Sequence, residues 1–248
     1  MFVKLTDLNS PLQETTRQAT GLLNPEAQDQ VALLKVLQQI TPESCPKSYN
    51  FHMHTVKSDG RLQPDELIDQ AIQIGLQGLA ITDHHTVEGY QIAQAHLNQW
   101  KASHPENQAL APVLWTGLEI SAGLLGIEVH VLAYGFDPEA PSLQPYLQRE
   151  TVYGELYAAQ QVIAAIHQAQ GLAVLAHPAR YKVSASALIP EATDLGIDGV
   201  ETYYNYRHTN PWNPTPEITD EVRTLADHFN LLNTCGTDTH GLNLLLRL

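Results

Sequence analysis

Residues 49–55 read YNFHMHT, and the prediction of the fold starts from this short, largely apolar run. Its length and composition indicate a β-strand. His52 and His54 stand two positions apart in the run, and side chains two apart on a strand point to the same face. Two imidazoles placed in this way can bind one metal ion.

Six more apolar runs follow, and segments with helical patterns lie among them. Strands that alternate with helices favour a mostly parallel sheet covered by helices, as in a barrel or a doubly wound α/β fold. The six runs are GLQGLAIT (residues 75–82), PVLWTGLEIS (112–121), IEVHVLAYGF (127–136), GLAVLAHP (171–178), DGVETYY (198–204) and LLNTCGTD (231–238).

Two predicted helices show their starting residues. Thr215 before Pro216, and Asn24 before Pro25, have the cap-then-proline order of a helix N-terminus. We predict that residues 1–48 are an extension whose one helix packs an apolar stripe on the body, and that residues 49–248 form the main domain. Apolar residues recur at helical spacing at Val31, Leu34, Leu37 and Ile40, at Leu67, Ile68, Ala71 and Ile72, and at Ile218, Val222, Leu225 and Phe229.

The chain has 248 residues and a formal charge of −14, with 27 acidic residues against 13 Lys and Arg. This balance argues against duplex nucleic acid as a partner, because Lys and Arg supply that affinity. A hydrophobic fraction of 43% with 16% charged residues indicates a globular protein. No run reaches the roughly 18 apolar residues of a membrane span, and the first residues lack a secretory signal, so we expect a cytoplasmic protein.

Metal-capable side chains stand at or near the ends of almost all the predicted strands. Barrel enzymes build their sites at the C-terminal ends of their strands, so residues far apart in the sequence converge there. After the second run, Asp83 and His85 stand on either side of His84. The candidate metal ligands are His52, His54, Asp59, His84, Glu119, His130, His177, Asp238 and His240.

Each candidate also has a purely structural interpretation. His130 fits a core histidine, Glu119 a helix cap, and Asp59 a common Asp-Gly turn. Those interpretations leave the joint position at strand ends unexplained. Six imidazoles and three carboxylates without a thiolate suit zinc, manganese or iron, since the two cysteines, Cys45 and Cys235, are too few for a thiolate site. Nine ligands are too many for one ion, so we predict two or three divalent ions.

The motifs FHMHT, KSDG, ITDHH, GLEIS, VHVLAYGF, LAHPARY and GTDTHG occur in this order between residues 49 and 241. In that combination the chain resembles the polymerase and histidinol phosphatase (PHP) domain family. Within the family it looks most like the bacterial metal-dependent phosphoesterases that act on nucleotide phosphates and short RNA. The resemblance implies a distorted (β/α)7 barrel, similar to a TIM barrel, around a trinuclear metal site.

By motif position, the resemblance also implies which residues share an ion. The sequence departs from the family pattern at two places. His85 stands where many relatives have Asp, and residues 137–171 leave room for little more than one long helix where the nucleotide-phosphatase branch commonly has a helical cap domain. The implied sets are His52, His54, Glu119 and Asp238; Asp59, His84 and His240; and Glu119 as a bridge to His130 and His177.

The implied reaction is hydrolysis of a phosphoester by metal-activated hydroxide. Arg180 can bind a phosphate through two parallel hydrogen bonds, although it also fits a surface arginine at a helix start. His240, or His208 in the long polar loop of residues 203–216, could protonate the leaving alcohol. Weaker candidates for phosphate binding are Lys57, Arg61 and Arg207.

Three alternatives remain open. One is a phosphomonoesterase like histidinol phosphatase. Another is an amidohydrolase, which usually bridges two metals through a carboxylated lysine, whereas here Glu119 is the available bridge and no lysine ends the third or fourth run. The third is a catalytically silent metal-binding scaffold, with residues 1–48 for docking. As partners we expect a small phosphorylated substrate or short single-stranded RNA.

Overall fold

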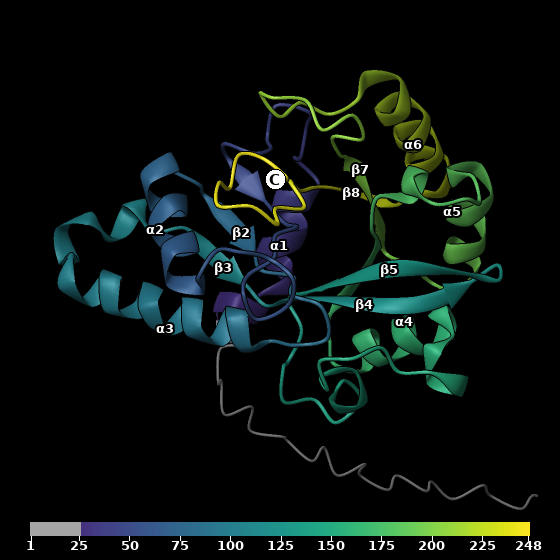
Figure 1. Ribbon diagram of the computed structural model, residues 1–248, viewed down its shortest axis with the longest axis horizontal. Helices are drawn as coiled ribbons and strands as arrows, with labels where there is room; N and C mark the ends of the chain where they lie inside the picture. Colours follow the sequence, from purple (N-terminus) through teal and green to yellow (C-terminus); the bar gives the residue numbers. More distant parts are fainter. Residues whose placement is uncertain (1–25) are drawn as a thin grey trace, which may run out of the picture.

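The computed structural model describes residues 26–248, and the predicted helix start at Asn24 and Pro25 lies outside them. All seven predicted strand runs contain strands, and helices cover the sheets (Figure 1), so the α/β class is confirmed. The strands are β1 (Tyr49–Asn50), β2 (Gly78–Ala80), β3 (Val113–Trp115), β4 (Gly117–Leu124), β5 (Ile127–Tyr134), β6 (Leu172–Leu175), β7 (Gly199–Tyr203) and β8 (Leu232–Cys235).

The strands pair in two sheets, in the orders β1-β2-β3 and β4-β5-β6-β7-β8. The first sheet is parallel, and β6, β7 and β8 are parallel as well. The strand β5 runs antiparallel to both β4 and β6. A two-residue turn joins β4 to β5, with φ of 49° at Leu125 and 75° at Gly126, and such short turns impose antiparallel pairing. The sheet is therefore mostly, but not wholly, parallel.

Backbone hydrogen bonds join the two sheets at both of their junctions. The Phe51 amide donates to the Cys235 carbonyl at 3.0 Å, which links the chain after β1 to β8. At the other junction the His85 amide donates to the Glu119 carbonyl at 3.0 Å, linking the end of β2 to β4. Only Thr116 separates β3 from β4. The ends of β1, β2, β4 and β8 therefore lie close together.

Two helices show the residues typical of helix ends. Pro64 starts α2 and Gly75, with φ of 84°, ends it. Thr215 caps α6 as predicted, and Asn230 ends that helix in the left-handed region. The α-helices are α1 (Gln30–Leu37), α2 (Pro64–Ile74), α3 (Glu88–Ser103), α4 (Ala159–Gln168), α5 (Ala185–Asp194) and α6 (Pro216–Phe229). Short 3-10 turns occupy Glu26–Gln28, Pro105–Leu110, Gln144–Tyr146, Gly154–Tyr157 and Pro178–Arg180.

The apolar stripe predicted for the first helix is wrong in part. Asp29 caps α1 and accepts a hydrogen bond from the Ala32 amide at 3.0 Å. Leu33 and Leu37 are buried, whereas Val31 is 63% exposed. The buried stripe thus consists of Leu33, Leu37 and Ile40 with Leu34 partly buried, whereas Val31 lies in the first turn of the helix on its exposed side. It packs in one cluster with aromatic residues such as Phe51 and Trp115, so this part of the extension lies against the body.

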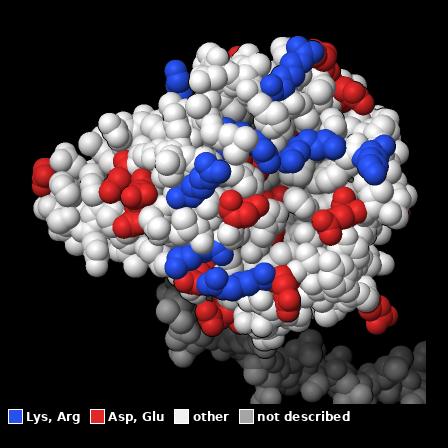
Figure 2. All heavy atoms as spheres, in the orientation of Figure 1, with Lys and Arg blue, Asp and Glu red and all other residues white. Residues whose placement is uncertain are grey.

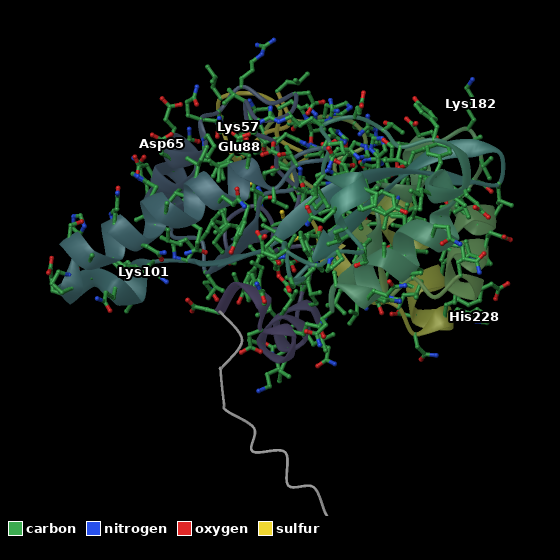
Figure 3. The ribbon with its side chains drawn as sticks, turned by 90° about the horizontal axis from the view of Figure 1, so that it is seen from below. Lys57, Asp65, Glu88, Lys101, Lys182 and His228 are labelled. Carbon is green, nitrogen blue, oxygen red and sulfur yellow. The ribbon has the colours of Figure 1, made fainter. Side chains whose placement is uncertain are left out.

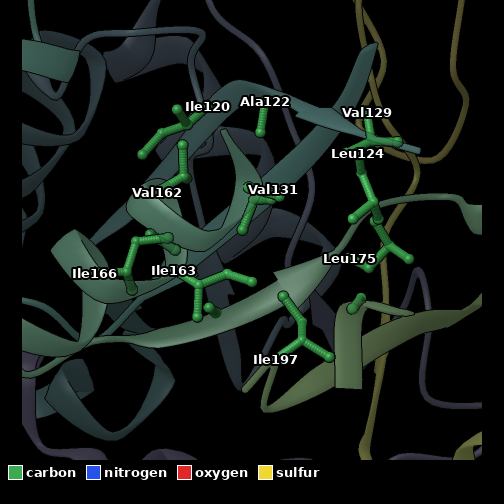
Figure 4. Packing of buried hydrophobic residues seen from close by; sticks show 14 of the residues in the cluster. Ile120, Ala122, Leu124, Val129, Val131, Val162, Ile163, Ile166, Leu175 and Ile197 are labelled. Atoms are coloured by element: carbon green, nitrogen blue, oxygen red, sulfur yellow. The ribbon is translucent and has the colours of Figure 1, made fainter. Parts of the chain in front are cut away.

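The largest core cluster lies between β4, β5 and the helices that cover them (Figure 4). Ile120 and Val131 of the hairpin face Val162 and Ile166 of α4 in this cluster. Each fully buried aliphatic side chain contributes about 1.5–3 kcal/mol, so the hairpin is firmly held. In Figure 1, α2 and α3 flank the first sheet, and α4, α5 and α6 flank the second. Within residues 26–248, no helix is long and apolar enough to cross a membrane.

Candidate metal centre

The nine predicted metal ligands lie together where the two sheets meet. Their ligand atoms form four overlapping groups, and the atoms of each group lie within 4.8 Å of one another. The groups are His54, Asp59, His84 and His240; His52, His177 and Asp238; His52, His54 and Glu119; and His84, Glu119 and His130.

Glu119 lies at the centre of these groups. It sits on β4 and is 1% exposed, and five imidazoles surround its two carboxylate oxygens. Two rings approach Oε1 and three approach Oε2, so this one side chain belongs to two of the four groups. The distances are 2.7 Å to His130 and 3.7 Å to His177 from Oε1, and 3.1 Å to His52, 3.1 Å to His54 and 3.5 Å to His84 from Oε2.

Asp238, three residues after β8, is the second buried carboxylate. Its Oδ1 lies 3.4 Å from Nε2 of His52 and 3.2 Å from Nε2 of His54. Its φ of 52° is in the left-handed region, which is unfavourable for a residue other than glycine and is often found at functional sites. Three donors hold its other oxygen: the Tyr204 hydroxyl at 2.7 Å, Nη1 of Arg180 at 2.9 Å and Nε of Arg247 at 2.9 Å.

Asp59 forms the outer edge of the cluster. It follows a turn, and its side chain is 55% exposed. Its Oδ2 lies 3.1 Å from Nε2 of His240 and 3.9 Å from Nε2 of His84, while its Oδ1 lies 3.5 Å from Nδ1 of His54. Nδ1 of His240 donates to the Asp238 carbonyl at 2.8 Å, because a carbonyl can only accept. Nε2 of His240 lies 3.1 Å from Oδ2 of Asp59, and because a carboxylate only accepts, this contact requires either a proton on Nε2 or a cation shared by the two atoms.

Glu201 on β7 belongs to the site, although the sequence analysis did not single it out. It is fully buried, and its Oε1 accepts a hydrogen bond from Nδ1 of His52 at 3.0 Å. Its Oε2 accepts the His177 backbone amide at 2.9 Å. The first bond fixes the tautomer of His52 and turns Nε2 toward the cluster, as carboxylates do for metal-binding histidines. The sequence signal that could have identified Glu201 is the position of an acidic residue in the middle of the predicted strand DGVETYY.

The pKa values in the site reflect its burial and its mixed charges. Burial lowers the pKa of His54, but Asp238 and Glu119 outweigh burial and raise it to about 9. Burial lowers the pKa of His84 to about 4, with Glu119 opposing and the charges of His54 and His130 assisting. Burial raises the carboxyl pKa values of Glu119 and Asp238, but the surrounding histidines bring both well below their usual range. Both acids are therefore ionised at neutral pH.

The buried polar atoms of the site fit bound cations. Both ring nitrogens of His54, Oε1 of Glu119 and Nδ1 of His177 are buried without an aligned hydrogen bond in the described part of the chain, although other site atoms lie within 2.7–3.7 Å of the first three. Leaving a buried polar atom unpaired costs about 1–3 kcal/mol, so several in one site call for another partner. Imidazole nitrogen and carboxylate oxygen are the donors that zinc, manganese and iron accept. The residues present thus fit a divalent metal centre.

The centre opens to a cavity of about 140 Å³. Arg180 and Arg247 line it, together with the carboxylates of Asp59, Glu119 and Asp238. The full lining is Asp59, His84, Glu119, His130, His177, Arg180, Asp238, His240 and Arg247. Arg247 and Tyr204 are further site residues that the sequence analysis did not name.

Other predicted residues lie outside this cavity. His208 is exposed and lines an adjoining cavity of about 110 Å³, to which Arg247 also contributes. Nδ1 of His85 donates to the Tyr146 carbonyl at 3.3 Å, and its Nε2 accepts the Ser121 amide at 3.3 Å. His85 therefore ties the chain after η3 (Gln144–Tyr146) to β4 instead of entering the centre.

The three weaker phosphate-binding candidates lie apart from the cavity lining as well. Lys57 pairs with Glu88 at 2.8 Å, and Arg207 pairs with Glu217. Arg61 is exposed. Arg180 alone among the predicted cations lines the cavity, and its guanidinium already donates to Asp238 and to the Tyr204 hydroxyl.

The PHP domain family model matches residues 50–182, which is more than half of the chain. The chain therefore belongs to the PHP family, and it is a metal-dependent phosphoesterase, a hydrolase of phosphoric esters. The family resemblance given by the motifs is confirmed.

Individual relatives share more limited identity. The chain is 24% identical to the 5'-3' exoribonuclease Rnm of Salmonella typhimurium, over 77% of this chain and 85% of that protein. It is 32% identical to the 3',5'-nucleoside bisphosphate phosphatase of Chromobacterium violaceum, over 50% of this chain and 39% of that protein.

Among solved structures, an amidohydrolase from Chromobacterium violaceum superposes with a TM-score of 0.65 and 19% identity, over 81% of this chain and 90% of that one. A protein of Bifidobacterium adolescentis superposes with a TM-score of 0.62 and 22% identity, over 79% and 88%. These two likenesses show the fold alone.

Proposed function

We propose that this chain hydrolyses phosphoesters of nucleotides or of short oligonucleotide ends at a trinuclear metal site. The observation that carries the proposal is the single carboxylate of Glu119 between five imidazoles. In our assignment Glu119 bridges, and the three ions bind to His52, His54, Glu119 and Asp238; to Asp59, His84 and His240; and to Glu119, His130 and His177.

We also propose that the strands form a distorted seven-stranded barrel, with β3 and β4 acting as one strand. The hydrogen bonds at both junctions of the two sheets support this arrangement. In this proposal the main domain comprises residues 49–248, and residues 1–48 are an extension to it.

Divalent ions bound at the centre supply Lewis acidity that activates water and neutralises phosphoryl charge. The chain's own residues bind and orient the substrate. Arg180 and Arg247 line the cavity with guanidinium groups, which can bind phosphoryl oxygens through parallel hydrogen bonds. The Tyr204 hydroxyl and both arginines hold Asp238, so its Oδ1 stays directed at His52 and His54.

Proton delivery to the leaving alcohol falls to His208 in this proposal. Nδ1 of His240 is committed to the Asp238 carbonyl and its Nε2 faces Asp59, so His240 serves better as a ligand than as an acid. His208 lines the adjoining cavity, where the leaving part of a substrate would extend past Arg247. Burial and the charges of Arg247 and Arg180 lower the pKa of His208, which makes its protonated form a stronger acid.

Nucleotide phosphates or short RNA ends are the proposed substrates because relatives from two organisms are named for them. Lys and Arg stand interspersed with Asp and Glu on the face shown in Figure 2, and the net charge is −14. That surface suits a small phosphate drawn to the metal centre better than a long duplex, which needs many cationic contacts. The amidohydrolase alternative is disfavoured because no lysine lines the cavity within residues 26–248.

The test loads the full chain with Mn, Zn or Fe, measures metal content and follows phosphate release. The substrates are p-nitrophenyl phosphate, mononucleotides, 3′,5′-bisphosphates, histidinol phosphate and short 5′-phosphorylated RNA. We expect turnover of a nucleotide or RNA substrate that depends on the bound metal. Turnover of histidinol phosphate alone would favour the phosphomonoesterase alternative. Tight metal binding with no turnover of any substrate would favour the scaffold.

A further inference from the structure

Asp83 is a buried acid beside the metal centre that the proposed reaction does not use. It is 1% exposed and directly precedes His84. Its Oδ1 accepts the Thr55 amide at 2.7 Å and the Ser58 hydroxyl at 2.8 Å, and its Oδ2 accepts the Thr55 hydroxyl at 2.7 Å. Both oxygens are therefore occupied by donors of residues 55–58, and Asp83 is not placed to bind an ion itself.

Residues 55–60 form the turn that carries Asp59, and backbone hydrogen bonds also support it. The Val56 amide donates to the Leu62 carbonyl at 3.0 Å, and the Ser58 amide donates to the Thr55 carbonyl at 3.1 Å. The Gly60 amide donates to the Thr55 carbonyl at 3.0 Å within the turn. Lys57 in this turn also forms a partly exposed ion pair with Glu88 at 2.8 Å, and the two side chains lie beside each other in Figure 3. Exposed ion pairs contribute little, about 0–1 kcal/mol, so the buried Asp83 bonds are the stronger anchor.

Asp59 itself adds little to its own placement. Its side chain is 55% exposed, and besides the Ser58 hydroxyl it contacts the imidazoles of His54, His84 and His240. Since no apolar packing fixes this carboxylate, its position follows from the turn. Asp83 is the buried side-chain anchor of this turn, because it accepts three hydrogen bonds from Thr55 and Ser58.

The start of α3 shows how closely Asp83 is enclosed. A Cβ atom added at Gly89 would lie 1.9 Å from Oδ2 of Asp83 and 2.8 Å from Oγ1 of Thr55. Any side chain at position 89 would displace the carboxylate or the Thr55 hydroxyl. The absence of a side chain at Gly89 therefore leaves room at the start of α3 for the hydrogen bond between the Thr55 hydroxyl and the Asp83 carboxylate.

We propose that Asp83 is a positioning residue that sets Asp59 and thereby decides whether the ion at Asp59, His84 and His240 is bound. The inference rests on the proposed metal centre. The proposal separates the ions into two kinds. Loss of Asp83 empties the outer position, whereas the ions at the ligands around Glu119 and Asp238 stay bound, because the contacts among those ligands do not involve residues 55–58.

The experiment counts bound ions by native mass spectrometry after the full chain is loaded with Mn or Zn. Asp83→Ala is expected to carry one ion fewer than the wild type. Asp83→Asn keeps an oxygen for the Thr55 amide and is expected to restore that ion. Asp198→Asn is the matched control, because Asp198 also accepts a backbone amide, that of Ala173 at 2.7 Å, away from the centre. This control is expected to keep the wild-type count.

Gly89→Ala provides a second variant in case Asp83→Ala does not fold. Alanine favours a helix more than glycine does, so a purely structural effect would leave the ion count unchanged or stabilise the fold. Our inference instead expects the loss of one ion. A full count in Asp83→Ala or in Gly89→Ala, or an equal loss in Asp83→Asn, would overturn the role of Asp83. A wild type that binds no ion and hydrolyses no ester would instead reject the proposed function.

Discussion

The metal centre has a buried part and a rim, and the fold holds them in different ways. In the buried part, Glu119 and Asp238 are at most 2% exposed, and the strand segments around them fix their orientation. At the rim, the side chain of Asp59 is 55% exposed and that of His84 is 24% exposed. The rim depends on a turn, whereas the buried part depends on strand pairing. For the proposed ions, we therefore expect weaker binding at the rim than in the buried part.

The two parts also differ in what supports their ligands. Glu201 orients His52 from behind, and Tyr204, Arg180 and Arg247 hold Asp238. Such supporting bonds are worth about 10–100-fold in metal affinity or activity. The support of the rim passes through Asp83 and a short turn. In the proposed site, we therefore expect a buried ion to exchange more slowly than an ion at the rim.

The largest effect is expected from removing a buried ligand. His54→Ala or Asp238→Asn should lower kcat by about 10³-fold or more while the far-UV circular dichroism stays that of the wild type, because the charge stabilisation of the reacting phosphoryl group is lost. His96→Ala is the control, since His96 pairs with Asp69 at 2.7 Å outside the cavity lining. Full turnover by either ligand variant would show the metal assignment to be wrong.

Stepwise removal of metal tests the comparison directly. On titration with a chelator, we expect one ion to leave first, with most of the activity, and the remaining ions to leave at higher chelator concentration. Because bound ions stabilise the folded state by about 2.7 kcal/mol when their concentration is 100 times Kd, the second step should lower Tm more than the first. Metal content, activity and Tm are measured on the same samples. Simultaneous loss of all ions would contradict a difference between rim and buried part.

A smaller effect is expected from the buried support of His52. Glu201→Gln removes a charge but keeps the shape, and should weaken metal affinity by about 10–100-fold. Metal affinity is measured by competition with a chelator of known Kd. Glu128→Gln is the control, because Glu128 accepts a hydrogen bond from the exposed side, from the Tyr157 hydroxyl at 2.9 Å. Unchanged affinity in Glu201→Gln would show that His52 is oriented without Glu201.

The strands and most of the candidate ligands could be predicted because they depend on local patterns. The run around His52 and His54 predicts a strand and a common face within seven residues; β1 covers only Tyr49–Asn50, and both histidines follow it, yet both contact Glu119. Glu201 was missed because the run DGVETYY, which predicts a strand, gives no sign of which partner this acid contacts in the folded chain. Arg247 reaches Asp238 only because the last residues fold back, with the His240 amide donating to the Arg247 carbonyl at 2.6 Å. Contacts of this kind depend on the tertiary fold.

The smallest effect concerns His208, which lies beyond both parts of the centre. His208→Ala should lower kcat about 10-fold for a nucleotide, whose alkoxide leaving group needs a proton, and much less for p-nitrophenyl phosphate, whose leaving group is stable as an anion. His228→Ala, at the end of α6, is the control. The ratio of the two rates is the measurement, because a general disturbance of the centre would lower both equally. An equal loss would place the proton donor within the centre, where His240 on the rim would be the residue to examine, and would make the rim part of the chemistry as well as of the metal site.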